Sequence, residues 1–231
     1  MFGSLLIWVV ALGALFASIP NTGPSAVTAD HATYMAAVHR WLDGGPFYHP
    51  YQLAGPYEIK MTEILYPPTI LPLLVVFAFL PDVLWWLVPL AIVVVVTIHW
   101  RPSLVGWTLV LACLAVPTTF ESIAYGNPGI WIAAFVALGT VFGWPAILVA
   151  LKPTFVPFML LGIQRRSWWI SLGALFLLSL AFLPLWSQYL AVLMNARGPL
   201  VSPLYSLNQT PMLLIALTAW VCRRRRETMP N

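Results

Sequence analysis

Charged residues are scarce in this sequence. Of its 231 residues, 61% are hydrophobic and only 8% are charged, whereas soluble domains carry about 25% charged residues. So few charges cannot cover the surface of a globule in water, so the sequence predicts that lipid surrounds most of the chain. The net charge is +4, but the basic residues are scattered or terminal. Without a basic patch, a nucleic-acid partner is not expected.

The sequence also lacks the usual signatures of disulfide, metal and nucleotide sites. It has two cysteines: Cys113 lies in an apolar run and Cys222 at the edge of another. This arrangement indicates neither a disulfide framework nor a metal site. A Gly-rich dinucleotide loop, a Walker phosphate loop and an Asp-x-Asp pair are all missing. The sequence therefore predicts no cofactor, although it leaves a dependence on a divalent metal open.

Long apolar stretches fill most of the chain. A spanning helix needs about 20 apolar residues, and eight stretches approach this length: 2–19, 67–80, 83–99, 103–120, 126–142, 144–163, 168–186 and 210–222. The fold class expected is therefore all-α: a polytopic integral membrane protein with about eight transmembrane helices in a single domain, 1–231. The 21 prolines favour broken helices that line a cavity. The first stretch has no charged residue before it, which favours a retained span over a cleaved signal peptide.

Two Arg clusters set the expected orientation. Arg165-Arg166 and Arg223–Arg226 should be cytoplasmic, because Lys and Arg collect on that side of a membrane. The tail 223–231 is then cytoplasmic and the loop 20–66 is extracytoplasmic. With eight spans, Arg101 would fall on the outer side, against the rule.

The segment Asp30 to Pro68 is the only long polar one. It contains most of the acidic residues and three of the four histidines. Within it, the spacing of apolar residues predicts a short helix over Asp30 to Leu42 that lies at the membrane interface. Thr28 is the expected N-cap, and Gly44-Gly45-Pro46 should end the helix.

Short motifs follow one another along nearly the whole chain. They are Asp30-x3-Tyr34, Trp41-Leu42-x-Gly44, Tyr48, Tyr66-Pro67-Pro68, Leu80-Pro81 with Trp85, Gly126-Asn127, Leu151-Lys152-Pro153, Trp186-x2-Tyr189 and Asn208-Gln209-Thr210. In this order they resemble the polyprenol-phosphate-sugar-dependent glycosyltransferases of the GT-C class, in particular the glycosyltransferase 87 (DUF2029) family.

The chain departs from that family in two ways. Gly126-Asn127-Pro128-Gly129 stands where the family has a Gly-Gln-x-Asn pattern, and the chain ends about twenty residues after its Asn-Gln-Thr motif, where family members continue with further spans. A non-catalytic or degenerate GT-C-like protein is therefore one alternative. A small transporter or flippase is another, although the two halves show no inverted repeat.

The resemblance implies an activity and roles for particular residues. The enzyme would move a hexose such as mannose from a polyprenyl-phosphate donor to a hydroxyl of a lipid or glycan acceptor, at the outer face of a bacterial plasma membrane. Asp30 would be the catalytic base. Lys152 and Arg40 would bind the donor phosphate, where negative charge develops. The expected substrate-binding residues are His31, Tyr34, Tyr66, Asn127, Asn208 and Gln209.

Each of these residues also has a purely structural interpretation. Asp30 could simply favour the positive end of a helix. Lys152 lies in the middle of an apolar stretch, where an ionisable residue is functional by default, but a partner such as Glu121 would make it structural. Tyr66 could be an interfacial anchor, and Asn127 a helix cap.

Overall fold

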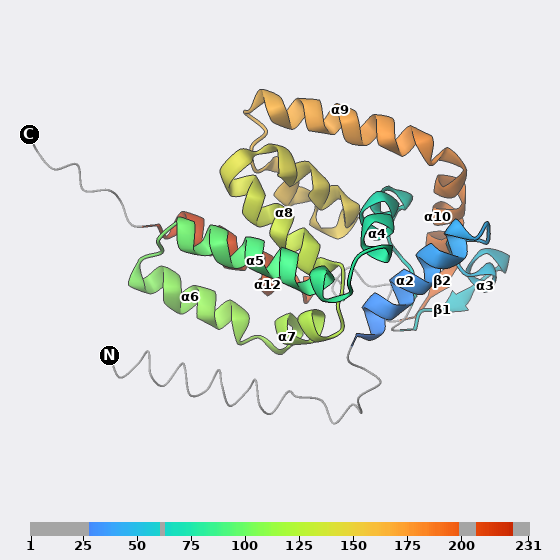
Figure 1. Ribbon diagram of the computed structural model, residues 1–231, viewed down its shortest axis with the longest axis horizontal. Coiled ribbons are helices and arrows are strands. Elements are labelled where there is room, and N and C mark those ends of the chain that lie inside the picture. Colours follow the sequence, from blue (N-terminus) through green and yellow to red (C-terminus); the bar gives the residue numbers. More distant parts are fainter. Residues whose placement is uncertain (1–27, 61–62, 199–206, 224–231) are drawn as a thin grey trace, which may run out of the picture.

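The computed structural model describes residues 28–60, 63–198 and 207–223, and it is mostly helical (Figure 1). The all-α prediction is thereby confirmed. Its only strands, within the described residues, are β1 (Tyr57–Glu58) and β2 (Ala196–Arg197), which pair in parallel. The predicted first span, 2–19, and residues 224–226 of the terminal Arg cluster lie outside the described residues.

One end of the molecule is a helical body built around α8 (Gly129–Phe142). Eleven of the 14 residues of α8 are buried, because the helix is apolar on every side and has no face suited to water. It packs against α5 (Val83–His99), α12 (Thr210–Val221) and the 3₁₀ helix η2 (Trp144–Leu151). On the other side of α12 lies α6 (Leu104–Leu114).

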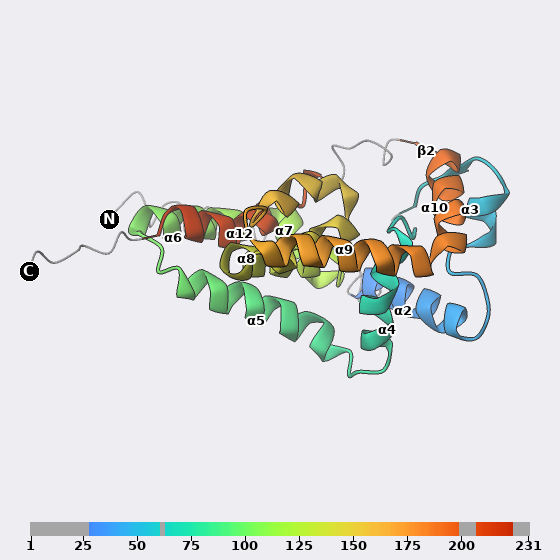
Figure 2. The same cartoon turned by 90° about the horizontal axis from the view of Figure 1, so that it is seen from above.

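The other end contains the polar segment, and Figures 1 and 2 show it beside the body. Here α2 (Ala29–Leu42) packs on α4 (Leu71–Ala78), which follows the 3₁₀ turn η1 (Pro68–Ile70). Nearby, α3 (Pro50–Ala54) packs on α10 (Leu183–Asn195). The long helix α9 (Arg166–Ala181) connects the two ends, and only Trp168 of its residues is buried. The predicted interfacial helix is thus α2, one residue longer than expected.

Four of the predicted spans fall in three bent pairs of helices: 67–80 and 83–99 form one pair, and 103–120 and 168–186 each correspond to a pair of their own. The bends are 113° between Pro68–Ala78 and α5, 61° between α6 and α7 (Pro117–Ala124), and 86° between α9 and α10. A proline stands at or beside each break, where it removes a backbone donor and disfavours helical geometry in the residue before it. By length and composition each pair could cross a membrane, whereas no described helix is long and apolar enough to do so alone.

The predicted span 144–163 is not one helix. It consists of η2 and a second 3₁₀ helix, η3 (Pro153–Leu160), and Lys152 between them has an extended backbone with φ −128° and ψ 94°. The cause is Pro153, because the ring of a proline clashes with a helical residue before it.

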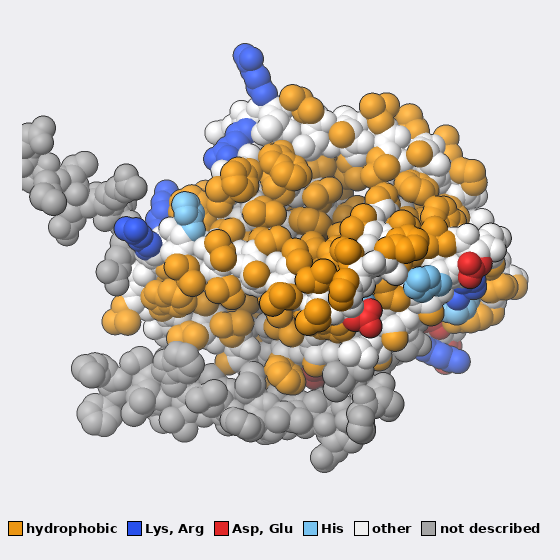
Figure 3. Space-filling view, viewed as in Figure 1, with side chains coloured by type: hydrophobic (Ala, Val, Ile, Leu, Met, Phe, Trp, Pro, Cys, Tyr) orange, Lys and Arg blue, Asp and Glu red, His pale blue; other side chains and the backbone are white. Residues whose placement is uncertain are grey.

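Basic segments meet at one end of the molecule. Figure 3 shows Lys and Arg over the end where α5 and α12 finish and over the start of α9, with others beside the Asp and Glu side chains of the opposite half. Pro102 forms a β-bridge with Arg223, and the Ser103 N–H donates to the Cys222 carbonyl (2.9 Å). The expectation that Arg101 lies on the opposite side from the C-terminal cluster is therefore wrong. It followed from counting eight membrane crossings, whereas the bridge brings the residue after Arg101 directly against Arg223.

Candidate functional site

Asp30 is held in place by the end of α7. The Thr28 N–H donates to the carbonyl of Ala124 (3.0 Å), and the His31 N–H donates to that of Tyr125 (3.1 Å). Thr28 stands at the N-cap position, as predicted, but it has a left-handed backbone (φ 71°) and its side chain makes no cap hydrogen bond. Carbonyls of a distant segment satisfy the first N–H groups of α2 instead. As a result, Asp30 faces the turn between α7 and α8.

Asn127 in that turn binds the Asp30 carboxylate directly. Its Nδ2 donates to Asp30 Oδ2 at 2.6 Å. Its Oδ1 accepts from the Gly129 N–H (2.8 Å) and from the Tyr66 hydroxyl (3.3 Å). The amide is therefore oriented from both sides, and Asn127 both caps the start of α8 and fixes the carboxylate.

Tyr66 packs in the core next to Asn127, to which its hydroxyl donates. Its side chain is buried, and its ring meets that of Tyr34 edge to face at 5.4 Å. The Tyr48 hydroxyl donates to the Tyr66 carbonyl at 2.8 Å. Three tyrosines from separate motifs in the sequence are therefore linked beside Asn127, one pair by a ring contact and the other by a hydrogen bond.

Lys152 enters the same site from the break between η2 and η3. Its Nζ donates to Gln209 Oε1 at 2.5 Å and lies 5.3 Å from the centre of the Tyr66 ring, which is within the range of a cation–π contact. Asp30 and Lys152 attract each other electrostatically, but they form no ion pair. Within the described residues, Glu121 is not an ion-pair partner of Lys152 either.

Opposing effects act on the pKa of the Asp30 carboxyl. Burial raises its pKa above the ordinary value of 3.8, while the hydrogen bond from Asn127 and the charge of Lys152 both lower it. Burial is the largest of the three, because a partly dry environment disfavours the charged form. Asp30 is thus a stronger base than an exposed aspartate.

His31 is turned away from this hydrogen-bond network. Its side chain is buried, with ring centres 5.6 Å from Trp85 and 4.8 Å from Trp86. Burial lowers its pKa, an effect opposed by Asp82, whose Oδ1 lies 4.0 Å from His31 Nε2. Its predicted role in substrate binding stays a prediction.

Arg40 lies apart from the cluster, and Asn208, although it precedes Gln209, forms no side-chain hydrogen bond with the described cluster residues. Arg40 follows Asp30 by ten residues, which is about 15 Å along a helix, and it donates to the carbonyls of Pro46 and Phe47 (2.7 Å each). Asn208 is exposed, and its carbonyl accepts from the Thr118 hydroxyl (2.6 Å). Their predicted contacts with donor and substrate stay predictions.

Trp86 was not singled out from the sequence, and Gly126 and Gly129 were quoted only as motif positions, without a role in the site. A Cβ on Gly129 would lie 2.6 Å from Gln209 Oε1, and one on Gly126 (φ +68°) would lie 2.6 Å from Trp86 Cζ2. The Trp86 indole donates to the Ile123 carbonyl (2.7 Å). The available signal was the spacing Gly126-x-x-Gly129 around Asn127, which indicates a close approach of backbone and side chains.

The assembled cluster consists of Asp30, Tyr66, Asn127, Lys152 and Gln209, which come from five separate segments. It places a carboxylate, an ammonium group, two amides and a phenol together. Such a set can bind hydroxyl groups and an anion and can accept a proton. Within the described residues, no group of three or more His, Cys, Asp or Glu side chains could hold a metal ion.

Comparison with known proteins adds no family or fold assignment. No protein-family model, curated protein or solved structure matches the chain.

Proposed function

We propose that this chain is a membrane glycosyltransferase that moves a hexose from a polyprenyl-phosphate donor to a hydroxyl of a lipid or glycan acceptor. One observation carries the proposal: Asp30, Tyr66, Asn127, Lys152 and Gln209 lie in one cluster although they are far apart in the sequence. All five belong to the motifs that resemble those of the glycosyltransferase 87 family.

The cluster offers a base for the acceptor hydroxyl and a positive charge for the leaving phosphate, the two groups that the transfer requires. The Asp30 carboxylate accepts the proton of the acceptor hydroxyl, and the oxygen attacks the anomeric carbon of the sugar. The bond from that carbon to the phosphate oxygen breaks, and the electron pair leaves with the polyprenyl phosphate. Lys152 stabilises the charge that grows on this phosphate. The amides of Asn127 and Gln209 and the Tyr66 hydroxyl orient the sugar.

The membrane location is part of the same proposal. The low charge content and the three bent helix pairs agree with a multi-pass protein of a bacterial plasma membrane. The basic end of the molecule would face the cytoplasm, and α2 with Asp30 would face outward, at the interface where a lipid-linked donor presents its phosphate.

The test is transfer of labelled hexose from a polyprenyl-phosphate donor to membrane lipids by the purified protein. Asp30→Asn keeps the shape and a hydrogen bond with Asn127 but removes the base, and turnover should fall by about 10² to 10⁴. The matched control is Asp43→Asn, because Asp43 is exposed just after α2. Transfer by Asp30→Asn at the wild-type rate would refute the role of Asp30.

The same assay separates the alternatives. Wild-type protein that binds the donor without transferring sugar would indicate a non-catalytic relative. Movement of the intact donor across a vesicle bilayer, without transfer, would indicate a flippase.

A further inference from the structure

Four consecutive carbonyls beside the site, those of residues 123–126, each accept a hydrogen bond from a segment that is distant in the sequence. The acceptors are Ile123, Ala124, Tyr125 and Gly126, and their donors, in the same order, are the Trp86 indole (2.7 Å), the Thr28 N–H (3.0 Å), the His31 N–H (3.1 Å) and the Trp85 indole (2.8 Å). The first of these carbonyls belong to the last turn of α7, where helical partners run out. The start of α2 and the start of α5 therefore hold the 123–126 stretch together, and Asn127 is the residue that follows it.

The two indoles reach the 123–126 stretch from the first turn of α5. Trp85 and Trp86 are the third and fourth residues of that helix, and successive helical residues point about 100° apart, so the two rings diverge. Both rings also pack against His31, with ring centres at 5.6 Å for Trp85 and 4.8 Å for Trp86. The fit is close, because a Cβ on Gly126 would meet Trp86 Cζ2 at 2.6 Å and His31 Cβ at 2.8 Å.

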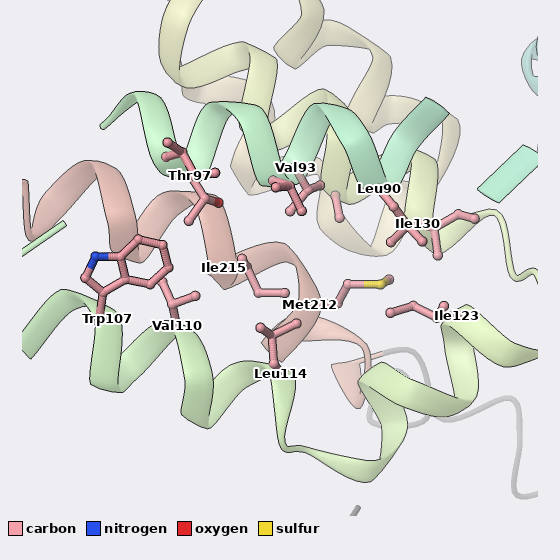
Figure 4. Close-up of a pocket in the computed structure, with 13 residues that line it drawn as sticks. Leu90, Val93, Thr97, Trp107, Val110, Leu114, Ile123, Ile130, Met212 and Ile215 are labelled. Atoms are coloured by element: carbon pink, nitrogen blue, oxygen red, sulfur yellow. The ribbon is translucent and has the colours of Figure 1, made fainter. Parts of the chain in front are cut away.

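The neighbouring pocket cannot replace the indoles. It is an apolar hollow between α5 and α6 that begins at Ile123 (Figure 4). Among the described residues that line it, only Thr97 and Trp107 carry a side-chain nitrogen or oxygen, and both lie at the end opposite Ile123. Trp85 and the Gly126 carbonyl are buried, and a buried carbonyl that loses its partner is costly. The indole donors are therefore needed where they stand.

The Trp85 hydrogen bond bears most directly on Asn127. The Gly126 carbonyl and the Asn127 N–H belong to one planar peptide group. Trp85 holds the carbonyl, and the Ser122 carbonyl accepts from the Asn127 N–H at 2.9 Å, so this peptide group is fixed at both ends. The Asn127 side chain then reaches Asp30 Oδ2 at 2.6 Å. A looser peptide group would let the amide move away from the carboxylate.

We propose that Trp85 and Trp86 are positioning residues of the candidate site, which hold the 123–126 stretch so that Asn127 stays bonded to the Asp30 carboxylate. Trp85 acts on the peptide group next to Asn127, and Trp86 acts at Ile123, three residues earlier. The importance of this arrangement for sugar transfer rests on the proposed function, whereas its effect on the Asp30 carboxyl does not.

The titration of the Asp30 carboxyl tests the proposal without any assay of activity. The chain has three aspartates, Asp30, Asp43 and Asp82, so labelling the aspartate carboxyl with ¹³C gives few resonances, and Asp30→Asn and Asp43→Asn assign them. Trp85→Phe keeps an aromatic ring and removes the N–H donor. A hydrogen bond to the charged form lowers the pKa of a carboxyl. Weakening the Asn127 bond should therefore move the Asp30 midpoint to higher pH.

A double-mutant cycle shows whether Trp85 acts through Asn127. Asn127→Ala alone should also raise the Asp30 midpoint, and adding Trp85→Phe to it should cause no further rise. The matched control is Trp168→Phe, because the Trp168 indole is also buried and donates to a backbone carbonyl, that of Met159 (2.6 Å). This variant should leave the Asp30 midpoint where it is in the wild type.

Three results would overturn the proposal. One is an unchanged Asp30 midpoint in either Trp85→Phe or Trp86→Phe. Another is a further rise when Trp85→Phe is added to Asn127→Ala, and the last is an equal rise in Trp168→Phe. If Trp85→Phe does not fold, benzothienylalanine in place of Trp85 keeps the two fused rings and replaces only the N–H by sulfur, and it should give the same rise.

Transfer assays on the same variants separate this proposal from the proposed function. In an active protein, the acid limb of kcat/KM against pH should move together with the Asp30 midpoint in Trp85→Phe. A protein that transfers no sugar but shows the shifted midpoint would refute the transferase activity and retain the positioning role. An active Trp85→Phe protein whose acid limb and Asp30 midpoint are both those of the wild type would retain the activity and refute the positioning role.

Discussion

At the scale of single residues, Asn127 is one of the groups that set the pKa of the proposed base, Asp30. The Asn127 hydrogen bond lowers the pKa of Asp30, against the larger effect of burial. Removing this bond by Asn127→Ala should raise the pKa of Asp30 further. Because only the ionised carboxylate accepts a proton, activity is present above this pKa and is lost as the pH falls through it. The acid limb of kcat/KM against pH should therefore move to higher pH in the variant.

The control for this shift is Asn195→Ala. Asn195 also donates through its amide, but to the Gln52 carbonyl (3.0 Å), within the α3 and α10 region. Its loss should leave the acid limb in place. An unshifted limb in Asn127→Ala as well would mean that another group sets the pH dependence.

Lys152 carries the next prediction at this scale. Lys152→Met keeps the aliphatic stem and removes the charge, so the affinity for the polyprenyl-phosphate donor should fall by roughly tenfold to a hundredfold, or about 1.5–3 kcal/mol for a hydrogen bond to a charged group. Equilibrium binding of a fluorescent donor measures this. Lys60→Met, at an exposed position, is the control.

The structural interpretation of Lys152 makes the opposite prediction. If Lys152 served only to neutralise Glu121, Lys152→Met would bind donor normally and would need Glu121→Gln to fold. The hydrogen bond of Lys152 to Gln209 instead leads us to expect that Glu121→Gln has little effect on either variant.

At the scale of elements, the turn between α7 and α8 depends on two glycines that act differently. Gly129 leaves room for the end of a flexible side chain, Gln209 Oε1, whereas Gly126 combines a left-handed backbone with contacts to the Trp86 ring and to His31 Cβ. Gly129→Ala should therefore displace the Gln209 amide and reduce transfer while changing the unfolding temperature little. Gly126→Ala should lower stability by about 1–3 kcal/mol through backbone strain.

Thermal unfolding and transfer assays on the two variants test this difference. Gly173→Ala in α9 is the control, because no atom lies within 4 Å of an added Cβ there and alanine favours a helix. Equal losses of stability in Gly126→Ala and Gly129→Ala would contradict the separate roles.

At the scale of the whole molecule, the end that holds Arg101, Arg165 and Arg223 predicts the topology, because Lys and Arg collect on the cytoplasmic side. A single cysteine at exposed Ala54 of α3 should react with an impermeant maleimide in intact cells, in a variant with Cys113→Ser and Cys222→Ser. A cysteine at exposed Gln164, beside Arg165, should react only after lysis. The reverse pattern would invert the orientation and place Asp30 in the cytoplasm.

The sequence by itself determined the helical class and several boundaries. The apolar stretch 83–99 is α5, and the helix expected from Asp30 to Leu42 is α2, ended before Gly44. These features depend on residues that are neighbours along the chain: apolar spacing, and glycine or proline at helix ends. Motif order also selected five residues that meet in one cluster.

Only the tertiary structure decided how those residues meet. Asp30 and Asn127 are 97 positions apart, and Lys152 and Gln209 are 57 apart, so no local pattern pairs them. Packing likewise gave the first N–H groups of α2 carbonyl partners at the end of α7, gave Lys152 an amide partner, and brought Arg101 to the side of Arg223. The physical reason is common to all three: these contacts are fixed by which distant segments bury their apolar faces together, and local sequence does not encode that choice.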